Sequence, residues 1–372
     1  MLRTITFRNV QGSFVRWVST TPTNNNSAAS PVYAPEKRET FYYNEMDIIR
    51  AEPSQMLPKP TTLDGLKFGH SFADHMMEAD WHIDNGWTKA LISPLHNFNL
   101  HPGAKVLHYA IELFEGMKAY RGVDNKIRIF RPEQNMERMR RTAARSSLPP
   151  TLGVADSHEA KLYVLTGPAG AYYPTGFKPI TLLADSEFVR AFPGGVGSFK
   201  MGCNYAPTIL IGKIATSLGC QQVLWLYDKD EKLTEVGTMN IFMYWRNEQG
   251  EEELVTPPLS DGLILPGVTR NSLIDIAKSW NEFKVTERYP TMEELRRGIK
   301  EKRVLQVFGA GTACVVSPVG RILYKNQKTK QHEELLIPTM ESKPDIMQRL
   351  YDTIVDIQYG RIEWPGWTRT VA

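Results

Sequence analysis

The residue of this chain best suited to covalent chemistry is a lysine that follows a glycine-rich turn. Lys200 comes directly after the run 194–199, and Tyr205 stands five residues further on. Glycines let a backbone approach a flat ligand closely and adopt positive φ angles. A lysine held there and partly removed from water can lose its proton and attack a carbonyl carbon. Lys200 is therefore the candidate nucleophile of a Schiff-base enzyme.

Five further motifs strengthen this interpretation, because a lysine seen alone is most often a solvated surface charge. They span residues 68–76 (FGHSFADHM), 113–120 (LFEGMKAY), 234–240 (TEVGTMN), 265–270 (LPGVTR) and 308–314 (FGAGTAC). In residues and order they closely resemble the branched-chain amino acid aminotransferases, the pyridoxal-phosphate enzymes of fold type IV. The resemblance runs from about Phe68 to Trp364.

The resemblance implies roles around pyridoxal 5'-phosphate. Lys200 would bind the cofactor covalently and then move the substrate's proton as general acid and base. Tyr205 would donate a hydrogen bond to the ring oxygen. Glu235 would pair with the pyridine nitrogen and keep it protonated, which makes the ring a stronger electron acceptor. From its local sequence alone, Glu235 would be a solvated residue near a hairpin turn.

The cofactor's phosphate needs hydrogen-bond donors, which a helix start supplies because its first amides lack helical partners. The segment containing Val268 and Thr269 predicts such a start, and the glycine turn that ends at Thr312 predicts a second group of donors. By resemblance, Arg138 matches the arginine that the family uses on the phosphate. Seen locally, Arg138 is one of several arginines on the solvated face of a basic helix.

Substrate selectivity in this family rests on an apolar pocket. The positions that match it are Phe68, Tyr109, Phe114, Thr238 and Ala313. Aromatic residues at such positions are also common in ordinary cores. The resemblance implies leucine, isoleucine and valine as amino donors, 2-oxoglutarate as acceptor, and a homodimer. An apolar pocket separates such donors only weakly by size.

Composition sets broad limits on function. The chain has 372 residues, 42% of them hydrophobic and 23% charged, as expected of a globular protein of one large or two smaller domains. A net charge of +3 is too small to predict nucleic-acid or membrane partners. Three cysteines provide no disulfide framework and favour a reducing compartment. No motif predicts a metal site.

The N-terminal segment differs in character from the rest. Arg3, Arg8 and Arg16 precede the first acidic residue, Glu36, and apolar residues recur at helical spacing among them. An amphipathic leader with arginines and no acids is typical of a mitochondrial transit peptide, which predicts the mitochondrial matrix. The alternative is a disordered tail. A linker rich in Asn, Ser, Thr and Pro follows over residues 20–34.

Hydrophobic periodicity predicts an α/β protein, or α+β with mixed sheets, in two domains. The expected helices are 133–145, 205–218, 268–280 and a last one that is started by Pro344 and ended by Gly360. The expected strands are 126–130, 162–165, 180–183, 222–227, 240–245 and 303–308. Asn204 is expected to cap the second helix, and Thr291 with Glu294 forms a capping-box pattern. The expected division is a leader and linker over 1–35, a small α/β domain over 36–174, a connection over 175–179 and a large cofactor-binding domain over 180–372.

One departure from the family pattern leaves the activity of this chain open. After Pro149 the family continues with a helix, a loop and a strand that brings a tyrosine and an arginine toward the substrate, whereas in this chain the segment 150–154 (PTLGV) follows at once. The alternatives are a natural variant, a splice form or a faulty gene model. The other functions that remain are an impaired chain that pairs with a full-length partner, and another class-IV enzyme such as a D-amino acid aminotransferase or an aminodeoxychorismate lyase.

Overall fold

The computed structural model describes residues 37–62, 66, 69–148, 158–170 and 177–371. The predicted leader and linker, Phe68 and the junction after Pro149 therefore lie outside the described residues. Part of the predicted connection over 175–179 lies outside them as well. None of the helices in the described ranges is long and apolar enough to cross a membrane. These ranges also hold no group of three or more His, Cys, Asp or Glu side chains arranged to bind a metal ion.

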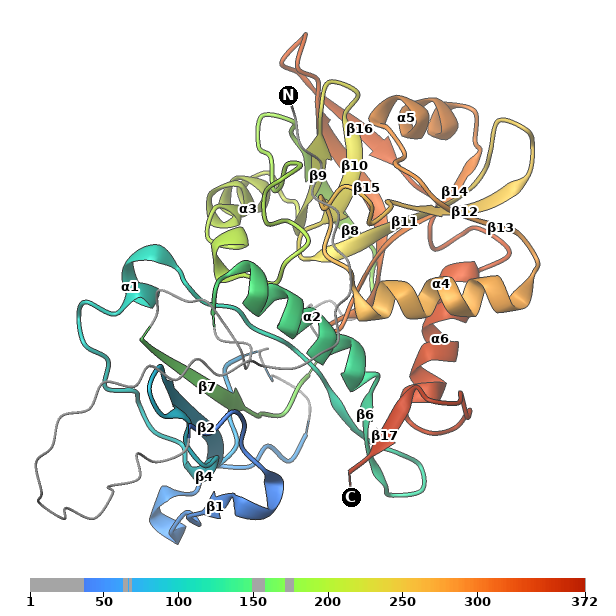
Figure 1. The fold of residues 1–372 in the computed structure, drawn as a ribbon. Helices are drawn as coiled ribbons and strands as arrows, with labels where there is room; N and C mark the ends of the chain where they lie inside the picture. The colour runs from blue at the N-terminus through green and yellow to red at the C-terminus, as the bar shows by residue number, and fades with distance from the viewer. Residues whose placement is uncertain (1–36, 63–65, 67–68, 149–157, 171–176, 372) are drawn as a thin grey trace, which may run out of the picture. The chain divides into compact units, whose positions relative to one another are not determined.

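A nine-stranded mixed sheet forms the main framework (Figure 1). Its strands are β8 (Ile180–Ala184), β9 (Gln222–Tyr227), β10 (Lys232–Val236), β11 (Met239–Arg246), β12 (Glu252–Thr256), β13 (Lys284–Glu287), β14 (Val304–Gly311), β15 (Val315–Lys325) and β16 (His332–Leu336). The order is β10-β9-β8-β15-β14-β11-β12-β13, with β16 beside β15. Because β10 also pairs with β11, the first six strands close into a ring.

Apolar side chains fill both sides of this ring. One buried cluster draws on all six ring strands and includes Trp245, which is fully buried. The helix α5 (Met292–Lys300) adds Leu295 to the same cluster. A second cluster packs the other face against helices α4 (Val268–Trp280) and α6 (Ile346–Gln358), which contact each other. With both faces covered, the strands read as continuous apolar runs, as buried strands do.

Two smaller sheets complete the described fold. One has the order β1-β4-β2-β3, with β7 on the other side of β2, and its strands are β1 (Asp47–Ile48), β2 (His75–His82), β3 (Gly86–Trp87), β4 (Leu91–Pro94) and β7 (Glu159–Leu165). The other contains β5 (Ala119–Arg121), β6 (Ile127–Phe130) and the C-terminal β17 (Thr368–Thr370). The helices α1 (Lys105–Tyr109), α2 (Pro132–Arg145) and α3 (Thr208–Ser217) lie between strands along the chain.

The mixed α/β character predicted from periodicity is confirmed, and most elements lie within a few residues of their predicted ranges. The helix predicted over 268–280 has those bounds. The capping box is formed, because Thr291 accepts a hydrogen bond from the Glu294 amide and the Glu294 side chain accepts one from the Thr291 amide. The division into two domains is not tested by these elements and stays a prediction.

The prediction that Asn204 caps a helix starting at Tyr205 is wrong. Asn204 ends a short 3₁₀ turn, and α3 begins only at Thr208. The Asn204 amide instead donates to two backbone carbonyls, those of Val196 and Phe199, at 2.8 Å each. An asparagine before a helical pattern has the same sequence signature in either role, so the pattern alone does not separate them.

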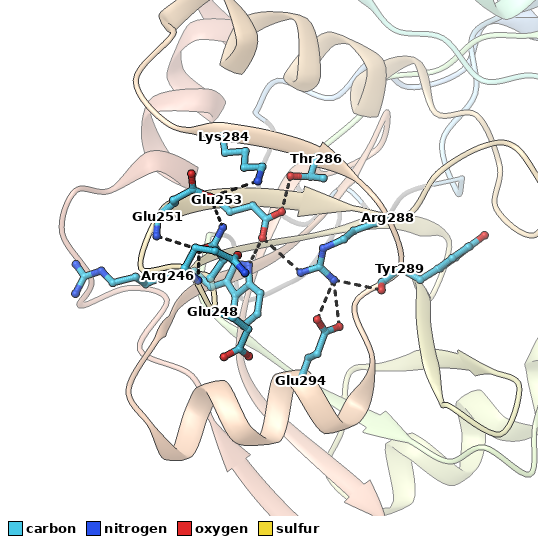
Figure 2. Close-up of polar contacts among 12 residues, drawn as sticks. Arg246, Glu248, Glu251, Glu253, Lys284, Thr286, Arg288, Tyr289 and Glu294 are labelled. Atoms are coloured by element: carbon cyan, nitrogen blue, oxygen red, sulfur yellow. Dashed lines mark hydrogen bonds and ion pairs between the residues drawn. The ribbon is translucent and has the colours of Figure 1, made fainter.

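A polar network fastens the β12–β13 side of the large sheet to α5 (Figure 2). The buried Glu253 carboxylate accepts hydrogen bonds from the Trp245 indole at 2.7 Å and from the Thr286 hydroxyl. Arg288 reaches Glu253 at 3.4 Å and also binds both carboxylate oxygens of Glu294 at 3.0 and 3.1 Å. Burial by itself raises the pKa of Glu253, but these donors bring it below its usual value.

Glu253→Gln is therefore expected to destabilise the fold at neutral pH by about 1–3 kcal/mol, because a buried charged acceptor is lost. A carboxyl with a lowered pKa stabilises the folded state above its unfolded pKa, and this contribution disappears as the pH falls through the folded pKa. The thermal midpoint of the variant should thus differ from that of the parent at pH 7 and approach it in acid. The exposed Glu293→Gln is the matched control, and an unchanged midpoint for Glu253→Gln at pH 7 would refute this role.

Candidate active site

The loop that carries Lys200 is held from three sides by hydrogen bonds to its backbone. The side-chain amide of Asn204 donates to two backbone carbonyls of the same loop, as described above. Thr142, on α2, accepts a hydrogen bond from the Lys200 amide at 3.2 Å. The Phe114 amide donates to the Lys200 carbonyl at 3.1 Å. The backbone at the lysine therefore has little freedom, and it sets the direction in which the side chain leaves the loop.

The Lys200 amine lies beside two aromatic side chains, Tyr205 and Phe114. Its Nζ atom is 3.1 Å from the Tyr205 hydroxyl and 4.4 Å from the centroid of the Phe114 ring. The two rings pack against each other with centroids 5.0 Å apart. Burial, and then the charge of Arg138, lower the pKa of Lys200 to about 8. Burial raises the pKa of Tyr205 to about 12, so its phenol stays protonated and able to donate.

Strand β10 carries a buried carboxylate, that of Glu235. Glu235 forms an ion pair with Arg190 at 2.8 Å and accepts a hydrogen bond from the Leu265 amide at 2.8 Å. Asn240 approaches the same carboxylate at 3.4 Å and donates to the Leu265 carbonyl at 2.8 Å. Burial raises the pKa of Glu235, and the charge of Arg190 opposes this rise. Glu235 is therefore buried among polar partners, whereas its local sequence alone predicts a solvated turn residue.

The predicted phosphate residues come together at one cavity. Val268, Thr269 and Thr312 line it, in company with residues Gly116, Met117, Lys118, Tyr120, Phe130, Asn135 and Gln358. Val268 opens α4, and no side chain caps the start of that helix. The first amides of a helix have no helical acceptors and form a site for anions. The cavity thus joins a helix N-terminus to a threonine from the turn between β14 and β15.

Arg138 lies at the same helix start, but its guanidinium already has a partner. It binds both oxygens of Glu115 at 2.7 Å each and donates to the Pro266 carbonyl at 2.9 Å. Both side chains of this ion pair are buried. The pair ties α2 and the 113–120 segment to the residues that precede α4. Contact between Arg138 and a phosphate stays a prediction.

The predicted substrate residues are only partly brought together. Phe114 lies against Lys200 and Tyr205, and 42% of it is exposed. Thr238 lies in the turn between β10 and β11. This turn is next to the 311–314 turn that holds Ala313, because the Cys314 sulfur lies 3.0 Å from the sulfur of Met239, the residue after Thr238. Tyr109 is 74% exposed at the end of α1.

Sequence reasoning missed three residues that hold this site together: Arg190, Glu115 and Asn240. Glu115 lies inside one of the recognised motifs, so its position could have drawn attention to it. Arg190 stands 45 positions from Glu235, and nothing in its local pattern marks it as a buried partner. Asn240 is the second residue of β11, close to the strand end, where a polar residue is ordinarily assumed to be solvated.

Comparison with known proteins identifies the family. Residues 198–322 match the model of the amino-transferase class IV family. A cytosolic branched-chain-amino-acid aminotransferase of Caenorhabditis elegans is 55% identical over 90% of this chain and 91% of its own length. The chain belongs to the branched-chain aminotransferase family. Other members include a cytosolic one of Ovis aries, 46% identical over 91% of this chain and 95% of its own, and a mitochondrial one of Bos taurus, 45% identical over 81% and 86%.

Solved structures of branched-chain aminotransferases share the fold. The enzyme of Thermoproteus uzoniensis with norvaline aligns with a TM-score of 0.58 at 20% identity, covering 79% of this chain and 99% of the other. The pyridoxal-phosphate form from Thermobaculum terrenum aligns with a TM-score of 0.61 at 17% identity, covering 82% and 100%. The mixed fold of type-IV aminotransferases is thereby confirmed.

The family alignments contain positions at which this chain has no residue. The alignment with the nematode aminotransferase runs over 376 positions, although the present chain has 372 residues and only 90% of them are covered. The alignment with the Bos taurus relative likewise runs over 343 positions, which is more than the number of residues in the 81% of this chain that it covers. The alignments therefore include positions that are occupied in the relatives and absent here.

Proposed function

We propose that this chain catalyses pyridoxal-phosphate-dependent transamination of leucine, isoleucine and valine with 2-oxoglutarate. The observation that carries the proposal is the Lys200 amine, 3.1 Å from the Tyr205 hydroxyl and with a pKa lowered to about 8. An amine of this kind is a nucleophile near neutral pH, as attack on a carbonyl carbon requires. The high identity to branched-chain aminotransferases supports the choice of substrates.

The residues of the site fit pyridoxal phosphate. The cavity offers the start of α4, whose first amides have no side-chain cap, and the Thr312 hydroxyl as hydrogen-bond donors to an anion. Tyr205 provides a donor and Glu235 a buried acid for the polar atoms of a pyridine ring. Lys200, Arg138, Tyr205, Glu235, Val268, Thr269 and Thr312 would hold the cofactor.

When bound, pyridoxal phosphate supplies the carbonyl carbon that Lys200 attacks and an electron-accepting ring conjugated to the substrate. Once the substrate's amino group has displaced Lys200 from that carbon, the freed Lys200 Nζ would take the proton from the substrate Cα and return it as a general acid. The Tyr205 hydroxyl orients this amine. Glu235 and Arg190 provide a charged pair excluded from water, in which electrostatic interactions are stronger than in solution. Phe114 and Ala313 would meet the substrate's side chain and carboxylate.

Capture of the cofactor should depend on pH through the Lys200 amine, because only the neutral amine is nucleophilic. The rate at which the cofactor-free chain incorporates pyridoxal phosphate is expected to rise with pH and level off above about 8. Stopped-flow absorbance between about pH 6.5 and 9.5 measures this rate on both sides of that pKa. Nα-acetyl-lysine amide, whose only amine is the side-chain amine, is the control, and its rate should keep rising toward the ordinary lysine pKa of about 10.4. A protein profile that follows the free amine would refute the lowered pKa.

We also propose a homodimer located in the mitochondrial matrix. Apolar side chains on and near α1 are strongly exposed in the single chain: Leu107 at 57%, Tyr109 at 74% and Phe114 at 42%. A second subunit that covers them would bury apolar surface next to the substrate residues. The arginine-rich, acid-free leader supports mitochondrial import. Both mitochondrial and cytosolic aminotransferases stand among the relatives.

A second candidate function is an impaired chain that depends on a full-length partner. The aligned positions without a residue in this chain favour it, as does strand β7. Tyr163, Val164 and Leu165 on that strand are each more than two-fifths exposed. Among the described strands, β7 pairs only with β2, so its other edge has no strand partner there. Such an apolar edge is ordinarily covered in a folded protein.

The test is glutamate formation by the purified chain with leucine and 2-oxoglutarate, with and without pyridoxal phosphate. Cofactor-dependent glutamate formation with leucine, isoleucine and valine, and far less with aspartate, supports the proposal. The D-enantiomers serve as the control for the other class-IV activities. If the chain turns over only after mixing with a full-length relative, the second candidate function is the correct one.

A further inference from the structure

Lys118 is a partly buried cation whose ammonium has no carboxylate partner among the described residues. It lies in the 113–120 segment, and its ammonium donates to the Ala313 carbonyl at 2.6 Å. In the part of the chain that the structure describes, no carboxylate pairs with it or acts on its charge. Burial lowers the pKa of Lys118. Partial removal of a charge from water without a counter-charge costs free energy, so an ammonium in this position favours a nearby anion.

The ionisable group that does act on Lys118 is the Cys314 thiol, and this group stays neutral. Burial raises the pKa of Cys314 to about 12, so the thiol keeps its proton at physiological pH. Its sulfur instead touches the Met239 thioether at 3.0 Å. The thiol therefore supplies no anion, and the charge of Lys118 is left for a group that the described part of the chain does not contain.

The location of Lys118 indicates what that group is. Lys118 lines the same cavity as Val268 and Thr269 at the start of α4 and Thr312 in the opposite turn. A helix N-terminus, a hydroxyl and an ammonium are the donors that proteins bring together around phosphate or carboxylate groups. Their convergence from separate elements indicates that the cavity takes an anion.

The 113–120 segment also connects the two walls of this cavity. On one side, the Glu115 carboxylate binds Arg138, whose guanidinium donates to the Pro266 carbonyl at 2.9 Å, two residues before α4. On the other side, Lys118 donates to the Ala313 carbonyl. The segment thereby joins the start of α4 to the turn that carries Thr312 and Ala313, so a change at Lys118 acts on the position of that turn.

We propose that Lys118 is a positioning residue of this site, which holds the Ala313 turn in place and supplies the counter-charge to the anionic group bound against Val268, Thr269 and Thr312. The inference rests on the proposed function for the identity of that group as the cofactor's phosphate. It assigns to Lys118 a task that neither the motif resemblance nor the predicted site residues include.

Lys118→Met separates this role from a merely structural one. Methionine has a similar length but no charge and no donor. Removing a partly buried charge that has no counter-charge should leave the thermal midpoint of the cofactor-free chain unchanged or higher. The dissociation constant for pyridoxal phosphate should nevertheless rise about ten- to a hundredfold, because a charged hydrogen-bond donor is lost. KM for leucine should rise more than kcat falls.

Three comparisons complete the test. Lys118→Arg keeps the charge and should recover part of the cofactor affinity. Lys126→Met changes an exposed lysine near the same segment and should alter nothing. Inorganic phosphate, titrated against the cofactor-free chain in a thermal-shift assay, should raise the midpoint of the parent more than that of Lys118→Met. This last readout is independent of transamination, so it tests Lys118 even if the proposed function fails. Equal phosphate and cofactor affinities in parent and Lys118→Met would overturn the inference.

Discussion

Lys200→Ala should lower turnover of leucine and 2-oxoglutarate by at least about 10⁴-fold, because one side chain performs both covalent attachment and proton transfer. The fold should persist, since the loop is held by its hydrogen bonds with Thr142 and Phe114 and by those of the Asn204 side chain, none of which involves the lysine side chain. The measurement is glutamate formation at saturating cofactor, with the thermal midpoint recorded in parallel.

The matched control for this variant is Lys213→Ala, which removes an exposed lysine from α3. It should leave turnover within the error of the parent. Added primary amines offer a second readout, since a small amine that enters the vacated space can take over part of the proton transfer. Near-normal turnover by Lys200→Ala would show that the nucleophile has been assigned to the wrong residue.

Glu235→Ala should slow turnover about 10²–10³-fold, the usual cost of removing one electrostatic partner from a buried site. It should also destabilise the fold by about 3–5 kcal/mol, because Arg190 is left buried without a counter-charge. Chemical denaturation and single-turnover kinetics with leucine measure the two effects separately. The kinetic loss is expected to persist at saturating cofactor.

A double variant distinguishes the two effects. Adding Arg190→Met to Glu235→Ala removes the uncompensated charge and should recover much of the stability, but not the turnover. Glu235→Gln provides a milder comparison, because it keeps an acceptor for the Leu265 amide. Full single-turnover rates in Glu235→Ala, or recovery of turnover in the double variant, would contradict the assigned role of Glu235.

Local patterns were sufficient where the local chain decides the structure. The helix opened by Val268 was predictable because Pro266 and Gly267 precede a regular apolar pattern, and α4 has the expected bounds. The capping box at Thr291 was predictable because both of its hydrogen bonds join residues three positions apart. The buried strands were predictable from continuous apolar runs.

The site itself depends on pairs that are distant in the sequence, and local patterns do not contain them. Arg190 and Glu235 form an ion pair only because the chain before Lys200 folds back onto β10. Glu115 and Arg138 meet across separate elements, and each alone has the sequence character of a solvated charge. The return of strand β17 to β6 was likewise missed, since its three residues carry no periodic signal.

The central claim is that Lys200 and its neighbours form a working transamination site in this chain. The most direct test is the absorbance spectrum of the purified protein with pyridoxal phosphate, recorded before and after addition of L-leucine. The account predicts a visible band of protein-bound cofactor that leucine converts to the spectrum of the pyridoxamine form. A protein without this band, or with a band that leucine leaves unchanged, would contradict the claim.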